Sequence, residues 1–171
     1  MTTFGKVPAY QGAEKYEIDI SPDRRACTLT FSDFVAQIRG KAGAVPVVSR
    51  LFNFVLPLEG KEDHAEIEFT FQGTQSLEQG TTATLVCSVN GQTIAADFAP
   101  DMDLSIQRVL KFSTDNPSDC RLSILLLVGR DGESPEAEGQ LGVMAVDAEL
   151  LPRVGQRRTA PRALAPRGAQ P

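Results

Sequence analysis

Apolar and polar residues alternate with a period of two along most of the chain. The clearest stretch is residues 64–72, in which every second residue is apolar: Ala65, Ile67, Phe69 and Phe71. Because successive side chains of a β-strand point to opposite faces of a sheet, this pattern predicts a strand with one face against a core and the other in water.

The same alternation recurs at spacings typical of a β-sandwich. It predicts strands at residues 16–20, 27–32, 34–38, 52–58, 85–89, 94–98, 104–112, 120–128 and 143–150. Segments rich in Gly, Pro, Asn and Asp predict loops at 40–46, 60–63, 73–80, 99–103, 114–119 and 129–139. We therefore expect residues 1–151 to form one all-β domain, an antiparallel two-sheet β-sandwich of about eight or nine strands.

Two local signals refine this prediction. The dipeptide Asn90-Gly91 separates two predicted strands and favours a type I′ hairpin turn. At Asp33 the apolar parity shifts by one residue inside an extended run, which predicts a β-bulge.

The predicted strands 120–128 and 143–150 are apolar on both faces. In the first of them, Leu125 and Leu127 lie on the face opposite to Ile124. Such strands require cover on both sides, which a loop, the N-terminal segment or a second subunit could supply. Leu125 and Leu127 are therefore predicted interaction residues.

The charge is distributed unevenly. The chain has a net charge of −5, and its last twenty residues hold no acid but five arginines: Arg153, Arg157, Arg158, Arg162 and Arg167. Removing those five positive charges leaves residues 1–151 at −10. Residues 152–171 are predicted to be a disordered basic tail rich in Pro, Arg and Ala. The first four arginines are predicted to contact a partner.

The overall chemistry limits the partners and the compartment. An acidic body repels phosphates, so nucleic acid is not an expected partner except through the basic tail. No apolar run is long enough for a membrane span, and the N-terminus has no apolar signal region. These features predict a cytoplasmic protein without a membrane span, with a mature form cut from a precursor as the alternative.

The segment from Ile20 to Phe34, ISPDRRACTLTFSDF, resembles the opening of a family of small, mostly secreted β-sandwich proteins of unknown function. The stretch from Phe52 through Pro57 to Gly73 is similar to the middle of that family, as are three later residues: Leu77, Gly80 and Thr82. The resemblance covers residues 16–130 and implies a β-sandwich without assigned catalytic residues. The chain departs from the family in lacking the signal peptide and the usual cysteines, so secretion and disulfides do not follow.

The residues that carry nucleophilic chemistry are few. His64 is the only histidine and begins a solvent-facing row of acids, so an enzyme built on it would need a concave site there. The three cysteines, Cys27, Cys87 and Cys120, fall on core parities and are expected to fill space. We therefore expect no enzymatic activity.

Calcium binding and carbohydrate binding remain open as functions of this domain. Asp101 and Asp103, with Asp33 or a carbonyl, could bind calcium, although turn formation also explains these aspartates. A second acidic group is expected to be a solvated sheet face: Glu62, Asp63, Glu66 and Glu68. The absence of Trp and the presence of only two Tyr argue against stacking of a sugar ring.

The sequence therefore predicts a non-catalytic binding or assembly module that is a homo-oligomer or a subunit of a larger complex. A calcium-dependent or carbohydrate-binding β-sandwich module is the alternative. No cofactor other than calcium is suggested by the residues.

Overall fold

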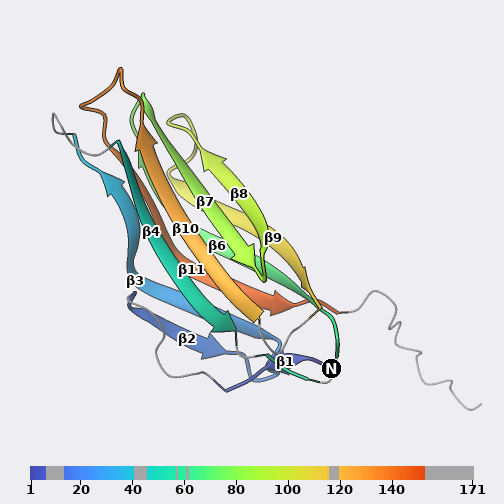
Figure 1. Cartoon of the computed structure of the whole chain (residues 1–171). Coiled ribbons are helices and arrows are strands. Elements are labelled where there is room, and N and C mark those ends of the chain that lie inside the picture. Colours follow the sequence, from blue (N-terminus) through green and yellow to red (C-terminus); the bar gives the residue numbers. More distant parts are fainter. Residues whose placement is uncertain (7–13, 41–45, 57, 61, 116–119, 153–171) are drawn as a thin grey trace, which may run out of the picture.

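The protein is an all-β sandwich, shown by a computed structural model that describes residues 1–6, 14–40, 46–56, 58–60, 62–115 and 120–152 (Figure 1). The strands in these ranges are β1 (Thr3–Phe4), β2 (Tyr16–Ile20), β3 (Ala26–Ile38), β4 (Val47–Leu56), β5 (Leu58–Glu59), β6 (Ala65–Leu77), β7 (Thr81–Val89), β8 (Gln92–Phe98), β9 (Ser105–Thr114), β10 (Cys120–Arg130) and β11 (Gly139–Leu150). The predicted fold class is confirmed.

Two antiparallel sheets make up the sandwich. One has four strands in the order β4-β10-β7-β8, and the other has five in the order β2-β3-β11-β6-β9. A short pair, β1 and β5, lies at one end (Figure 1). Because β4 and β8 are edge strands, β10 and β7 form the centre of the four-stranded sheet.

The core lies between the two sheets. It is formed by the apolar positions of the alternating segments, as predicted. The apolar residues of β6 that share a parity, from Ala65 to Phe71, are buried. All nine phenylalanines are buried, and Tyr16 packs its ring edge-on against Phe52 and Phe54 at centroid distances of 5.3 and 5.5 Å. This aromatic packing joins β2 of one sheet to β4 of the other.

The predicted bulge at Asp33 is confirmed. In the β3–β11 pair, Val143 lies opposite Phe34 and Ala145 lies opposite Thr30, so the register shifts at this point. Met144, which separates the two registers, is 54% exposed. The shift also corrects our expectation that strand 143–150 needs cover on both faces. The strand is apolar on both parities because the buried parity changes at Met144, not because both faces are apolar.

Several strands extend beyond their predicted bounds. The segment 73–80 was expected to be a loop, but β6 continues through it to Leu77. Gly73 does not form a turn there, since a Cβ at this position would lie 2.0 Å from the carbonyl oxygen of Gly142 on β11. The glycine instead permits a close approach of two strands beside the bulge. The β4 strand also begins at Val47 rather than at residue 52.

The predicted hairpin turn is present between β7 and β8. Asn90 and Gly91 have φ angles of 47° and 87°, the positive values that a type I′ turn requires at both central residues. Within the described ranges, the structure has no helix of sufficient length and apolarity to span a membrane.

Candidate docking face

The outward side of the four-stranded sheet is the strongest candidate for a binding surface, and we call it the four-stranded face. Its outward residues on β4 and β10 are Val47, Ser49, Leu51, Asn53, Val55, Arg121, Ser123, Leu125 and Leu127. Those on β7 and β8 are Thr82, Thr84, Val86, Ser88, Thr93, Ala95 and Asp97. In Figure 1, β4, β10 and β7 lie in the foreground, and no described strand is drawn across them.

The register of the strands arranges these side chains in rows of one chemical type. Leu125 is the cross-strand partner of both Leu51 and Val86, and Val86 is the partner of Ala95. These residues form an apolar row that crosses all four strands, because partners on one face of an antiparallel pair lie side by side.

The neighbouring row is polar across the same four strands. The Ser123 hydroxyl donates to Asn53 Oδ1 at 2.5 Å, and the hydroxyls of Ser88 and Thr93 hydrogen-bond to each other. A hydrogen-bonded polar row beside an apolar row gives this face a striped pattern that runs perpendicular to the strands.

The four-stranded face leaves apolar side chains in water. On β4, Val47 is 51% exposed, Leu51 is 55% exposed and Val55 is 39% exposed. The two predicted interaction residues, Leu125 and Leu127, are half-buried beside them. Within the described part of the chain, neither a loop nor the N-terminal strand covers this row. A contiguous apolar area on an otherwise polar surface is typical of an interaction site.

The four-stranded face is nearly free of charge, whereas the outer face of the five-stranded sheet is strongly acidic. On the four-stranded face, only Arg121 and Asp97 are charged, and Asp97 accepts a hydrogen bond from Thr84 at 2.8 Å. The outer side of the five-stranded sheet carries a group of acids on three of its strands: Glu17, Asp19, Glu66, Glu68, Asp147 and Glu149. Depletion of charge is characteristic of the centre of protein interfaces.

The acids on the outer side of the five-stranded sheet make ordinary surface hydrogen bonds and ion pairs. Asp147 accepts hydrogen bonds from Thr28 at 2.6 Å and from Gln72 at 2.9 Å, which come from the two neighbouring strands. Glu68 forms an exposed ion pair with Lys111 at 2.9 Å. These contacts fit the predicted role of this acidic surface as a solvated sheet face.

Two hollows adjoin β4. One, of about 400 Å³, lies on the four-stranded face and is lined by Asn53, Phe54, Val55, Arg121, Leu122 and Ser123. The other, of about 430 Å³, is lined by residues from strands of both sheets: Asp33, Val35, Gln37, Val48, Arg50 and Gln140. Both are bordered by amide and guanidinium groups that can hydrogen-bond a ligand.

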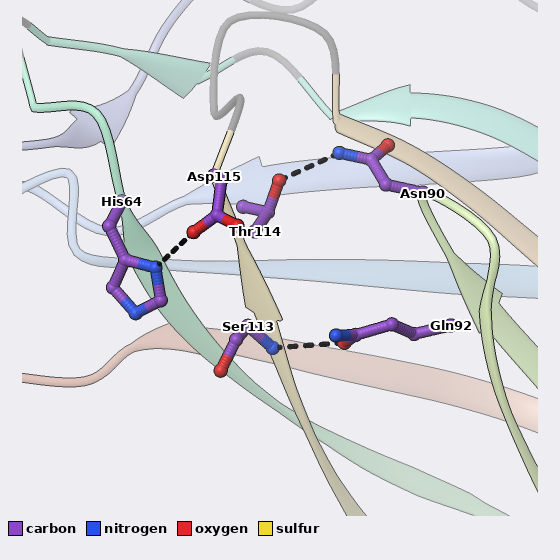
Figure 2. A network of polar contacts seen from close by, with 6 residues as sticks. All are labelled: His64, Asn90, Gln92, Ser113, Thr114 and Asp115. Atoms are coloured by element: carbon purple, nitrogen blue, oxygen red, sulfur yellow. Dashed lines mark hydrogen bonds and ion pairs between the residues drawn. The ribbon is translucent and has the colours of Figure 1, made fainter.

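His64 has a partner that sequence analysis missed. Its Nδ1 lies 2.8 Å from Asp115 Oδ1, and Figure 2 shows this pair at the ends of β6 and β9. The two strands pair with Ala65 opposite Thr114, so the next register position brings His64 to Asp115. The sequence alone does not reveal that His64 and Asp115 are close, because their proximity follows from the pairing of β6 with β9. The Asp115 side chain is 95% exposed, and the pair forms an open contact on the surface.

The same end of the sandwich contains a second set of polar contacts (Figure 2). Asn90 Nδ2 donates to Thr114 Oγ1 at 2.7 Å, and Gln92 Oε1 accepts from the Ser113 amide at 3.3 Å. Asn90 Oδ1 also accepts from the Arg121 amide at 2.8 Å. The hairpin turn is therefore tied to β9 and β10, a structural role.

The cysteines fill space, as the sequence predicted. Cys27, Cys87 and Cys120 are buried and free. Burial raises the pKa of the Cys27 thiol to about 12, with a smaller contribution from the Asp147 carboxylate. Burial likewise raises the pKa of Cys87 to about 12, with Cys120 contributing. Thiolates, the reactive form, are thus disfavoured at both sites.

The predicted calcium residues lie in the loop between β8 and β9. Asp101 and Asp103 are exposed, and the buried Gln75 donates from Nε2 to the Asp103 carbonyl at 3.0 Å. Among the described residues, no group of three or more His, Cys, Asp or Glu side chains is arranged to hold a metal ion. Calcium binding at this loop stays a prediction. The tail arginines Arg153, Arg157, Arg158 and Arg162 lie outside the described residues.

Comparison with known proteins adds little to these observations. No protein-family model matches the sequence, and no curated protein matches it. Among solved structures, the chain is similar to the TmCBM61 structure in complex with beta-1,4-galactotriose, with a TM-score of 0.35 and 11% sequence identity. The similarity covers 80% of this chain and 87% of that one. The β-sandwich implied by the family resemblance is present in the structure.

Proposed function

We propose that this protein is a non-catalytic binding module that docks a protein partner on its four-stranded face. The observation that carries the proposal is the apolar row of Leu51, Leu125, Val86 and Ala95 on a face with almost no charge. Burying such a row against a partner removes apolar surface from water without desolvating ionised groups.

The contrast between the two outer faces supports this choice. Both outer faces belong to one acidic domain, yet the acids concentrate on the five-stranded side. Charged side chains keep an exposed sheet soluble and prevent unwanted association. Their near absence from the four-stranded face, combined with the half-exposed leucines, is what a docking surface requires.

The proposal is tested by site-specific photo-crosslinking in the cells that make the protein. The photoreactive variant Leu51→p-benzoylphenylalanine is compared with Val109→p-benzoylphenylalanine. The two positions are matched, because Leu51 is 55% exposed and Val109 is 50% exposed, each on the edge strand of its sheet. We expect light-dependent protein adducts at position 51 and not at position 109. No adduct at position 51, or equal yields at both, would refute the proposal.

Carbohydrate binding is a second candidate, favoured by the hollow on the four-stranded face. Asn53, Arg121 and Ser123 line it, and their amide, guanidinium and hydroxyl groups can hydrogen-bond sugar hydroxyls. Phe54 also lines this hollow but is only 2% exposed, so its ring is not available to stack on a sugar. Titration of a panel of neutral oligosaccharides, followed by NMR, tests it. Shifts of Arg121 and Ser123 signals that Asn53→Ala abolishes would favour sugar binding over protein docking.

A further inference from the structure

We infer that the partner on the four-stranded face is a second copy of this chain, packed face to face about a two-fold axis. This inference rests on the proposed function, because it uses the same face. It adds the identity of the partner and the symmetry of the contact.

The striped pattern makes the four-stranded face complementary to itself. A two-fold axis that runs parallel to the strands, between β10 and β7, places β10 of one copy over β7 of the other and β4 over β8. Each row then meets its own row in the partner. Leu125 faces Val86, Leu51 faces Ala95, and Asn53 faces Thr93, so the apolar row meets the apolar row of the partner. In the next row, Leu127 faces Thr84.

A second aligned arrangement also buries the apolar row. A two-fold axis along that row would set Leu125 against itself and Ser123 against Leu127 of the partner. Each arrangement therefore opposes one hydroxyl of each chain to a leucine, and each packs the apolar row of one copy on that of the other.

The size of the face suits such a dimer. Four strands spaced about 4.8 Å apart, with residues rising about 3.3 Å each along the ten residues of β4, give a face of roughly 600 Å². Two copies would then bury about 1,200 Å², the lower end of specific interfaces. We expect a reversible dimer rather than an obligate one.

The charge distribution also permits this contact. Two copies of a chain with a net charge of −5 repel each other, and the repulsion is strongest where acids face acids. Packing through the four-stranded faces turns both acidic five-stranded faces outward, away from each other. The face with the least charge is therefore the one through which like-charged copies can meet.

The first test is the mass of the purified full chain in solution, measured by sedimentation equilibrium. We expect a concentration-dependent shift toward twice the chain mass of 18.5 kDa. The variant Leu51→Glu should weaken dimerisation at least tenfold, whereas the matched control Val109→Glu should leave it unchanged. Unaltered thermal unfolding of both variants shows that they fold. A monomer at about 0.5 mM, far above the micromolar range, overturns the inference. Equal effects of the two variants overturn it as well.

The second test determines the direction of the axis. The native cysteines are at most 2% exposed, so a short bis-maleimide reagent will report only introduced surface thiols. Because β4 and β8 are the two edge strands, an axis parallel to the strands predicts crosslinking of a mixture of Leu51→Cys and Ala95→Cys chains. An axis along the apolar row predicts crosslinking of Leu51→Cys chains to themselves. Crosslinked dimer in neither case overturns the face-to-face contact.

The outcomes separate the inference from the proposed function. A monomeric purified chain whose position 51 still crosslinks to a different protein in cells refutes self-association but leaves the docking role intact. A monomeric chain without any adduct at position 51 refutes both.

Discussion

The substitution Gly73→Ala should destabilise the protein even though alanine is ordinarily the better strand residue. A Cβ at this position would lie 2.0 Å from the Gly142 carbonyl oxygen and 3.0 Å from its carbon. These atoms belong to the backbone of β11 and cannot rotate away. Ordinary contact begins at 3.4 Å, so β6 and β11 would have to separate beside the bulge.

The cost follows from these distances. Overpacking of a tight site typically costs about 1–3 kcal/mol. We assign about 3 kcal/mol to this site, because the clash is with backbone atoms. Replacing glycine within a strand returns roughly 0.5–1 kcal/mol of conformational entropy. The expected net loss is therefore about 2 kcal/mol in the free energy of unfolding, or roughly 4–8 °C in Tm for a domain of this size.

The assay is equilibrium unfolding in urea, with two control variants. Gly132→Ala adds a Cβ that meets nothing within 4 Å, and we expect no loss of stability. Gly142→Ala approaches a movable atom, Val35 Cγ2, at 3.1 Å, and should lie between the other two. If Gly73→Ala unfolds at the same urea concentration as the wild type, β6 and β11 do not approach each other as closely as described at this position.

Three further predictions concern the core, the hairpin and the thiols. Phe71→Ala, which empties a fully buried site, should lower the free energy of unfolding by about 3–5 kcal/mol in urea titrations, and a loss under about 1 kcal/mol would contradict the packed core. Asn90→Gly keeps the positive φ but removes the side-chain bonds to Thr114 and to the Arg121 amide, so we expect a loss of about 1–2 kcal/mol in the same assay; an unchanged midpoint would show that these bonds contribute nothing. The pKa of the Cys27 and Cys87 thiols is raised from 9.0 to about 12 by folding, so their contribution to stability is intact below pH 9 and is lost as the pH rises toward 12. Stability measured against pH should therefore fall more steeply for the wild type than for a Cys27→Ala/Cys87→Ala variant, and parallel curves would refute the assignment.

The sequence predicted the sheet faces well because burial on one side of a strand enforces strict alternation. Phe69 and Phe71 could be placed in the core, and the parity shift at Asp33 revealed the bulge, because both signals are local. The change of parity at Met144 was misread as two apolar faces. From β11 alone, a change of the buried parity cannot be distinguished from two apolar faces. The pairing resolves it, because the register of β11 against both β3 and β6 shifts between Val143 and Ala145.

The candidate site was predicted only in part for the same reason. Leu125 and Leu127 were found because an outward leucine breaks the alternation of its own strand. Leu51 and Val86 were not recognised, since nothing within β4 or β7 marks them as partners of Leu125. The apolar row depends on cross-strand register, which is determined by pairing between distant segments.

The most direct test of the four-stranded face as the contact surface is methyl NMR of the full chain at increasing protein concentration. We predict that the methyl signals of Leu51, Val86 and Leu125 shift or broaden as concentration rises, while those of Val109, on the opposite sheet, stay constant. Constant signals from all four residues, or equal changes at Val109, would contradict the account.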